Sequence, residues 1–246
     1  MPYRRLPTTD KARSRALKAA LKMAEKTEEK KLAFTKIRLQ ELNLAKTNFE
    51  NSLTQYEADR KKQAEKNKEY KIVQEKTVLY ISHFILTLYM AVERDEIKED
   101  ALKNYNLQNL NKKLPRLATE EEILDWGKKI IDGEQKRIQS GGSPIYTPSI
   151  ALVKVNVEKF RDIAIFMQNL RKISARSHEK MKENRNATNL FISQLWNEIE
   201  ENLKSDSPKH KRQQAQEYGI IYVFRRKEKK KLKSDDLQTD LLFDFS

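Results

Sequence analysis

Apolar side chains recur at alternating spacings of four and three residues along a stretch that contains neither glycine nor proline. This stretch runs from Thr8 to Leu114, and within it residues 35–95 keep one helical period without a break in phase. The apolar positions of the seam are Phe49, Leu53, Tyr56, Tyr70, Val78, Ile81, Ile85, Leu88 and Val92. The pattern predicts one helix, or two nearly collinear helices, on the order of 90 Å long.

The middle of this seam is polar. At the same helical spacing, the seam positions in the middle of the stretch are occupied by polar residues, namely Arg60, Gln63, Asn67 and Gln74. A second helical stretch at about 150–203 repeats the plan, with an apolar seam at each end and mostly polar residues between 174 and 189. Its apolar positions are Val153, Val157, Phe160, Ala164, Met167, Leu170, Met181, Phe191, Leu195, Ile199 and Leu203.

Two antiparallel helices would match one polar middle to the other. Residues 78–92 would then lie beside residues 150–170, and residues 34–56 would lie beside residues 191–203. The alternative is that each helix folds at its polar middle and forms one compact four-helix bundle. Neither middle contains glycine or proline, which favours straight helices because sharp kinks usually need one of these residues.

Two shorter helices are predicted beside the long ones. Residues 11–26 are amphipathic, with Leu17 and Ala20 expected to face inward and Arg13 and Lys18 to face outward. Residues 120–139 form the other helix. It opens with Thr119 and Glu122 at capping-box spacing and stops at Gly141 and Gly142. These helices are expected to cover the two apolar ends of the long pair.

Residues 219–225 (GIIYVFR) give the one convincing strand signal, after a short basic helix at 208–218. A strand needs a partner, and the candidates are the connector 143–149, a second copy of the strand, or the edge of another protein. The predicted fold is all-α. It has two long antiparallel helices with shorter helices packed at the ends, elongated or four-helix-bundle-like, and one small β element near the C-terminus. The predicted organisation is a helical bundle at 1–205, a basic helix–strand appendage at 206–233 and an acidic disordered tail at 234–246.

Charge is concentrated at the ends of the chain. The 246 residues carry a formal net charge of +14. Residues 1–24 hold seven Lys or Arg against one Asp, and residues 208–233 hold ten against two Glu. The last thirteen residues hold four Asp. The two long helices are therefore close to charge balance, and a polyanion is expected to bind at the chain ends if it binds at all.

Several segments together resemble an uncharacterised family of helical proteins from the Bacteroidota. They are MPYRRLPTTDKARSRALKAAL at the start, KNKEY, YISHF, GGSPIYTPSIALVKVNVEKF and YGIIYVFRR. The resemblance covers almost the whole chain except the last dozen or so residues. It implies a helical fold and brings no catalytic residues.

No motif for catalysis or metal binding is present. The chain has no cysteine, no nucleophile elbow and no phosphate-binding loop. The three histidines, His83, His178 and His210, have no partner at metal-ligand spacing, and His83 is expected to be a core residue. The sequence predicts no catalytic residue, no bound metal and no cofactor.

Basic residues near both ends of the chain are the candidates for contact with nucleic acid. Lys and Arg neutralise phosphates, and neighbouring tyrosines can stack on bases. The candidate residues are Arg4, Arg5, Arg13, Arg15, Lys18, Lys211, Arg212, Arg225, Arg226, Lys229, Lys230 and Lys231. No known nucleic-acid-binding motif accompanies them, so the prediction depends on charge placement.

The C-terminal tail contains a short candidate docking motif. Gln238, Leu241 and Phe243 have the spacing Q-x-x-L-x-F, which resembles peptides that bind bacterial sliding clamps. A free amphipathic peptide with aromatic anchors can enter a hydrophobic groove on a partner protein.

These observations predict a non-enzymatic cytoplasmic scaffold or adaptor whose basic ends contact nucleic acid or a ribonucleoprotein such as the ribosome. The alternative is a self-associating structural helical protein, such as a homodimer, with no nucleic-acid role. No signal peptide or membrane span is predicted, since the apolar run 78–92 is shorter than the ~20 residues a bilayer span needs.

Overall fold

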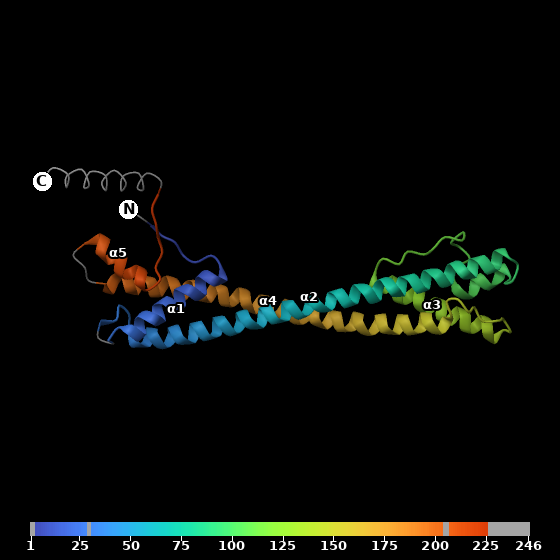
Figure 1. The fold of residues 1–246 in the computed structure, drawn as a ribbon, viewed down its shortest axis with the longest axis horizontal. Helices are drawn as coiled ribbons and strands as arrows, with labels where there is room; N and C mark the ends of the chain where they lie inside the picture. The colour runs from blue at the N-terminus through green and yellow to red at the C-terminus, as the bar shows by residue number, and fades with distance from the viewer. Residues whose placement is uncertain (1–2, 29–30, 204–206, 226–246) are drawn as a thin grey trace, which may run out of the picture. The chain divides into compact units, whose positions relative to one another are not determined.

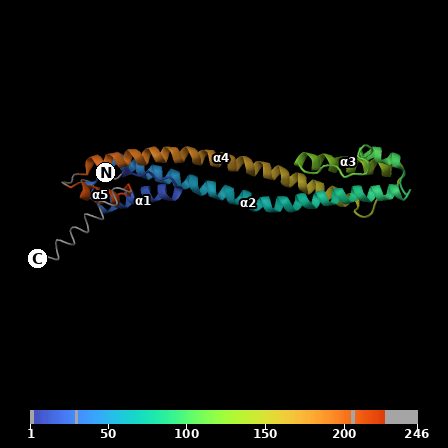
Figure 2. The same cartoon turned by 90° about the horizontal axis from the view of Figure 1, so that it is seen from above.

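The chain folds around two long helices, each of which is unbroken. The computed structural model describes residues 3–28, 31–203 and 207–225. Helix α2 (Lys36–Glu93) and helix α4 (Ile150–Asn202) run antiparallel and pack against each other (Figures 1 and 2). The predicted fold class is confirmed. The alternative in which each helix folds at its polar middle does not occur.

The residues group into two compact units, and both long helices contribute to each. Unit 1 comprises residues 1–57 and 176–246, and unit 2 comprises residues 58–175. The described part of the predicted appendage, residues 207–225, belongs to unit 1. The boundaries predicted at 205 and 233 stay predictions.

Unit 2 is a layer of α2 and α4 covered by helix α3 (Glu120–Gln139) and a short 3-10 helix, η2 (Glu99–Tyr105). The predicted pairing of residues 78–92 with 150–170 is confirmed. Helices α3 and α4 approach closely at Gly127 of α3, where a Cβ atom would lie 2.7 Å from Cγ2 of Val157 on α4. The core side chains include Ile81, Phe84, Ile85, Leu88, Tyr105, Ile123, Ile130, Val153, Val157, Phe160 and Met167.

Helix α3 begins and ends as its sequence predicts. The Thr119 hydroxyl accepts a hydrogen bond from the Glu122 N–H, and the Glu122 carboxylate accepts one from the Thr119 N–H. This reciprocal cap satisfies two backbone donors that the first turn leaves unpaired. At the other end Gly141 has φ +89°, a conformation that glycine adopts without strain.

Unit 1 joins the first part of α2 and the last part of α4 to helix α1 (Asp10–Lys26) and helix α5 (Pro208–Glu217). The predicted pairing of residues 34–56 with 191–203 is confirmed. Its core side chains include Leu17, Ala20, Leu42, Phe49, Ile192, Leu195, Trp196, Ile199 and Ala215.

The strand pairs with a partner that the sequence analysis did not consider. β2 (Tyr222–Val223) is shorter than the predicted 219–225, and it pairs antiparallel with β1 (Tyr3–Arg4) at the other end of the chain. The register sets Tyr3 opposite Val223 and Arg4 opposite Tyr222. A segment of two residues carries too little pattern to predict a strand from the sequence, and none was predicted at residues 3–4.

Two side chains point the opposite way from the prediction. His83 is exposed, because the neighbouring Ile81 and Ile85 direct the other face of α2 into the core. Arg13 is buried, because it lies four residues before Leu17 and seven before Ala20, on the same face of α1.

Candidate nucleic-acid interface

The two basic ends of the chain meet in unit 1. The Arg5 N–H donates to the Ile221 carbonyl at 2.8 Å, beside the pairing of β1 with β2. The turn before β2 packs on α1, where a Cβ atom at Gly219 would lie 2.8 Å from the Ala19 Cβ. Gly219 also has φ +89°, so this contact depends on glycine for both space and backbone conformation. Basic segments from opposite ends of the sequence therefore share one unit.

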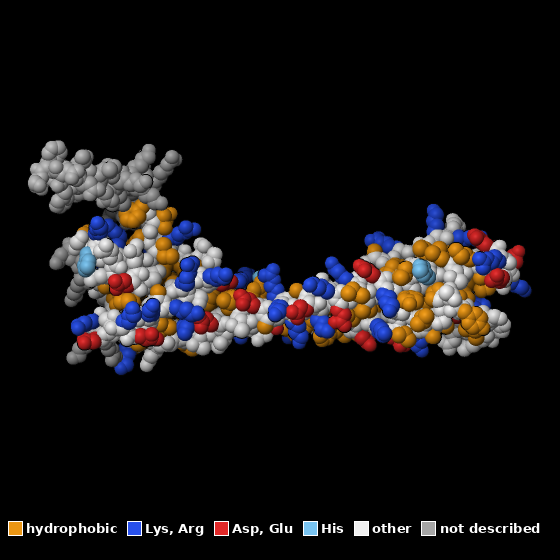
Figure 3. Space-filling model, viewed as in Figure 1, with side chains coloured by type: hydrophobic (Ala, Val, Ile, Leu, Met, Phe, Trp, Pro, Cys, Tyr) orange, Lys and Arg blue, Asp and Glu red, His pale blue; other side chains and the backbone are white. Residues whose placement is uncertain are grey.

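The outer face of α1 is a row of four cations. Lys11, Arg15, Lys18 and Lys22 are all exposed and follow one another at spacings of four, three and four residues. This spacing places them on one helix face, opposite the buried residues of α1. We call these four residues the basic row. Figure 3 shows Lys and Arg side chains over this part of unit 1.

The basic row is only partly neutralised by the protein. Lys18 Nζ lies 2.9 Å from Glu50 Oε1 on α2. Within the described residues, Lys11, Arg15 and Lys22 have no carboxylate partner. Three of the four cations thus have no carboxylate within the part of the chain that the structure describes to compete with a ligand.

The inner face of α1 is held by a polar cluster. The Arg13 guanidinium donates to Asn189 Oδ1 at 2.8 Å and to Asp10 Oδ1 at 3.0 Å. Arg185 donates two hydrogen bonds to the same Asp10 carboxylate. The hydrogen bond from Arg185 holds the pKa of Asp10 below its usual range, against the opposing effect of burial. Arg13 therefore fixes α1 on α4, and its guanidinium is already engaged.

Arg4 is also engaged within unit 1. Its guanidinium lies 5.9 Å from the centre of the Trp196 ring and 3.2 Å from Glu200 Oε2. The Tyr222 hydroxyl donates to the same carboxylate. Burial, together with this hydrogen bond, raises the pKa of Tyr222. The contacts join β1, β2 and α4 into one platform next to α1.

The other candidate residues have different settings. Arg5 and Arg225 are exposed, and Lys211 and Arg212 on α5 are half-buried. Arg226, Lys229, Lys230 and Lys231 lie outside the described residues, as do Gln238, Leu241 and Phe243 of the tail motif.

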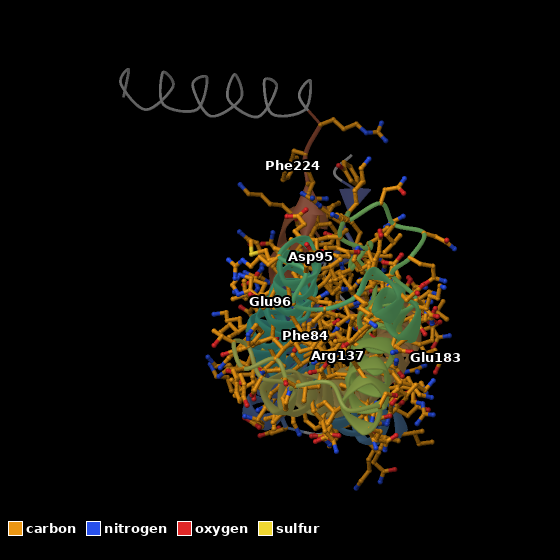
Figure 4. All side chains as sticks on the ribbon, turned by 90° about the vertical axis from the view of Figure 1, so that its right-hand side faces the viewer. Phe84, Asp95, Glu96, Arg137, Glu183 and Phe224 are labelled. Carbon is orange, nitrogen blue, oxygen red and sulfur yellow. The ribbon has the colours of Figure 1, made fainter. Side chains whose placement is uncertain are left out.

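Unit 2 contains a separate cleft of about 850 Å³. It lies between the C-terminal parts of α2 and α3, η2 and the connector 143–147. Arg137 lines it and is enclosed among the helices in Figure 4. The guanidinium donates two hydrogen bonds to the fully buried Glu134, both at 2.8 Å, and a third to the Ser143 carbonyl at 2.6 Å.

The cleft is built around an ion pair that holds the connector. Glu134 also accepts from the Tyr105 hydroxyl and from the Ile145 N–H. Burial opposes the ionisation of Glu134, but hydrogen bonds from Arg137, Tyr105 and Ile145 outweigh it and lower the pKa of this carboxyl. Burial and the bond to Glu134 raise the pKa of Tyr105. Glu134, Arg137 and Tyr105 all have hydrogen-bond partners within this network, which suits a structural role. No motif or residue spacing in the sequence predicted the network.

Metal and membrane sites were also sought among the described residues. No three or more His, Cys, Asp or Glu side chains converge there as metal ligands would. None of the helices in the described ranges is long and apolar enough to span a bilayer.

Comparison with known proteins does not supply a function. No family model, no curated protein and no solved structure matches this chain.

Proposed function

We propose that unit 1 binds nucleic acid, free or within a ribonucleoprotein, and that the protein acts as a non-enzymatic cytoplasmic adaptor. The observation that carries this proposal is the basic row on α1. Its four cations face outward, and only Lys18 is paired with a carboxylate among the described residues.

The dimensions of the basic row suit a nucleic-acid backbone. Lys11 and Lys22 are eleven residues apart, so the row is ~16 Å long at 1.5 Å per residue. One strand of a duplex carries a phosphate about every 3.4 Å, so the row spans roughly four or five phosphates. The buried face of α1 fixes these cations on a rigid helix, which reduces the entropy lost on binding.

Salt dependence provides the test. Binding of a fluorescent RNA or DNA oligonucleotide by the full chain is measured by anisotropy between 50 and 300 mM KCl. Each phosphate contact contributes about −0.9 to the slope of log K against log [salt] for duplex DNA. The variant Lys11→Glu/Arg15→Glu/Lys22→Glu is expected to bind more than tenfold more weakly and to lose about three units of slope.

A matched control keeps the change in net charge the same. Lys154→Glu/Lys159→Glu/Lys172→Glu replaces three exposed lysines of α4 in unit 2. This variant is expected to bind within a few-fold of the wild type. Equal weakening in both variants would mean that only net charge matters, and binding without salt dependence would contradict the proposal.

A further inference from the structure

Arg137 keeps one donor nitrogen that its buried network does not use. Nε donates to Glu134 and to the Tyr105 hydroxyl, and Nη2 donates to Glu134 and to the Ser143 carbonyl. Within the residues that the structure describes, Nη1 has no acceptor. The side chain is almost fully buried, and buried donors normally have a partner. Water or a ligand is therefore expected to supply an acceptor for Nη1.

Nη1 faces the cleft of about 850 Å³ in unit 2. Arg137 lines this cleft, whereas Glu134 and Tyr105 do not, so these partners hold the guanidinium from the side away from the cleft. Gly142 also lines the cleft, and a Cβ atom on it would lie 2.7 Å from Nη1. Glycine at this position therefore keeps a side chain away from the nitrogen. A donor that is fixed in place in advance loses little entropy when a ligand binds.

The charges around the cleft leave an excess of one cation. Each carboxylate in or beside the lining has a cationic partner, in the pairs Arg137–Glu134 at 2.8 Å, Lys103–Asp100 at 2.7 Å and Arg94–Glu96 at 4.0 Å. Lys98 also lines the cleft, and it forms no ion pair with the described residues. Lys103 lowers the pKa of Asp100, and Lys98 adds to this effect. The surroundings of the cleft therefore suit a ligand with a single negative charge.

The size and lining of the cleft suit a small molecule. Pockets for small ligands typically have ~300–1,000 Å³ and combine apolar walls with a few polar anchors. Small and apolar side chains line much of this cleft, namely Ala91, Ile97, Ala101, Pro144, Ile145 and Tyr146. Tyr146 is 79% exposed, so its ring is available to pack on a bound molecule. A single water molecule would satisfy Nη1 but would leave these apolar walls uncovered.

We propose that the cleft binds a small organic acid, a monocarboxylate with an apolar body, whose carboxylate accepts a hydrogen bond from Arg137 Nη1. A hydrogen bond between a guanidinium and a carboxylate is about twice as strong as one between neutral groups. The excess cation, Lys98, balances the single charge of such a ligand. A phosphate or a dicarboxylate would bring a second negative charge close to Glu96 and Asp100, which line the same cleft, and like charges oppose binding.

Glycine signals test where such a ligand binds. The chain has only five glycines, so isotopic labelling of glycine nitrogen gives a simple amide spectrum of the full chain. Phenylacetate, a small monocarboxylate with an apolar ring, is the probe. It is expected to shift the signals of Gly141 and Gly142, which line the cleft, with a Kd on the order of 1 mM for a ligand of this size. Gly219 belongs to unit 1, and its signal is the internal control that should not move.

A neutral analogue and two variants test the chemistry without disturbing the buried network. Phenylacetamide has the same shape as phenylacetate and no charge, and it should bind roughly fivefold more weakly. Lys98→Gln should remove most of this preference for the acid. Ala101→Phe places a ring in the cleft and should abolish the saturable shifts. Ala151→Phe, at an exposed position of α4 outside the lining, is the matched control and should bind phenylacetate as the wild type does.

The role of the guanidinium is tested by Glu134→Gln/Arg137→Gln, which removes both charges of the pair and keeps polar groups in their place. This variant should bind phenylacetate roughly tenfold more weakly, and helicity measured by circular dichroism checks that each variant folds. Several results would overturn the proposal: no saturable shift in the wild type, equal shifts of all five glycine signals, equal affinity for acid and amide, or unchanged binding by Ala101→Phe. The outcome does not depend on nucleic-acid binding by unit 1, because every residue changed here belongs to unit 2.

Discussion

At the residue scale, the Glu134–Arg137 pair shows how a buried charge is kept in this fold. Glu134 is fully buried and Arg137 nearly so. Each has further hydrogen-bond partners, which offset the cost of removing two charges from water. An intact buried pair is weak evidence for stability, but removing one partner leaves an uncompensated charge.

We predict that Arg137→Ala lowers the free energy of unfolding of unit 2 by roughly 3–5 kcal/mol. The change leaves the Glu134 carboxylate buried without its cation and releases the Ser143 carbonyl. Urea denaturation of the full chain measures the effect. The control Lys66→Ala removes an exposed ion pair with Glu69 and should cost no more than about 1 kcal/mol. Equal costs for the two variants would contradict the prediction.

Asp10 makes the stability of unit 1 depend on pH, and the direction of this dependence follows from the contacts of its carboxylate. Its pKa is lowered in the folded protein by Arg185 first and by Arg13. A group with a depressed folded pKa stabilises the fold above its unfolded pKa, and this stability is lost as the pH falls through the folded value. The contribution is therefore present above the unfolded pKa of about 4 and is lost progressively as the pH falls below it, through the lower folded pKa.

We predict that Asp10→Asn destabilises unit 1 by about 1–2 kcal/mol at pH 7, a figure reduced for the partial exposure of the carboxylate. The difference from the wild type should shrink as the pH is lowered and disappear near pH 2. Urea titrations at pH 7, 5, 3 and 2 measure it. A difference that stays constant over this range would show that Asp10 does not act through its charge.

At the element scale, the packing of α3 on α4 depends on Gly127. Alanine favours a helix over glycine by about 1 kcal/mol, so helix propensity alone predicts that Gly127→Ala stabilises the protein. A Cβ atom at this position would lie 2.7 Å from Val157 Cγ2 and 3.0 Å from its Cγ1. Valine has little freedom at χ1, so the clash cannot be relieved by a small rotation.

We predict that Gly127→Ala destabilises unit 2 by about 1–3 kcal/mol despite the better helix propensity. In a Val157→Ala background the same change should be neutral or stabilising, because the obstructing methyl groups are gone. The two single costs would then fail to add. Additive costs in a double-mutant cycle measured by urea denaturation would contradict the steric explanation.

The helices were predictable because they are long and strongly periodic. Helix α3 has the predicted bounds of 120–139, and the capping box at Thr119 identified its start. β1 and β2 have two residues each, and so short a segment has no period to detect. Their pairing is between opposite ends of the chain, a long-range choice that local sequence pattern does not encode.

The candidate site was predictable in composition but not in geometry. The sequence shows that cations gather near both chain ends. It does not show that Arg4 is engaged with Glu200 or Arg13 with Asn189, because these contacts join residues far apart in the chain. The helical period could have separated Arg13 from Lys11, Arg15 and Lys22, since Arg13 shares the face of Leu17.

At the scale of the whole molecule, the buried apolar residues of the described ranges form two separate clusters, one in each unit. Between them, residues 50–69 of α2 and 171–180 of α4 contain no buried side chain. Most helix stability in proteins comes from packing of an apolar face, and these two segments bury none. The polar middles are therefore expected to couple the unfolding of one cluster only weakly to the unfolding of the other.

The chain contains two tryptophans, and they report on different units. Trp196 is fully buried in unit 1, and Trp126 lies on α3 of unit 2, where the Lys129 ammonium is 4.6 Å from its ring centre. The variants Trp126→Phe and Trp196→Phe each leave one reporter. We predict two urea transitions with different midpoints, one for each fluorescence signal.

Adding Arg137→Ala to each single-tryptophan variant tests whether the units unfold independently. The transition reported by Trp126 should move to lower urea, because the uncompensated Glu134 lies in the same unit. The transition reported by Trp196 should stay in place, because none of the buried side chains around Trp196 belongs to the cluster that contains Tyr105 and Ile145. Superimposable transitions that shift together would show instead that α2 and α4 couple the units through their polar middles. In that case the unbroken helices, and not the two apolar clusters, would set the cooperativity of the fold.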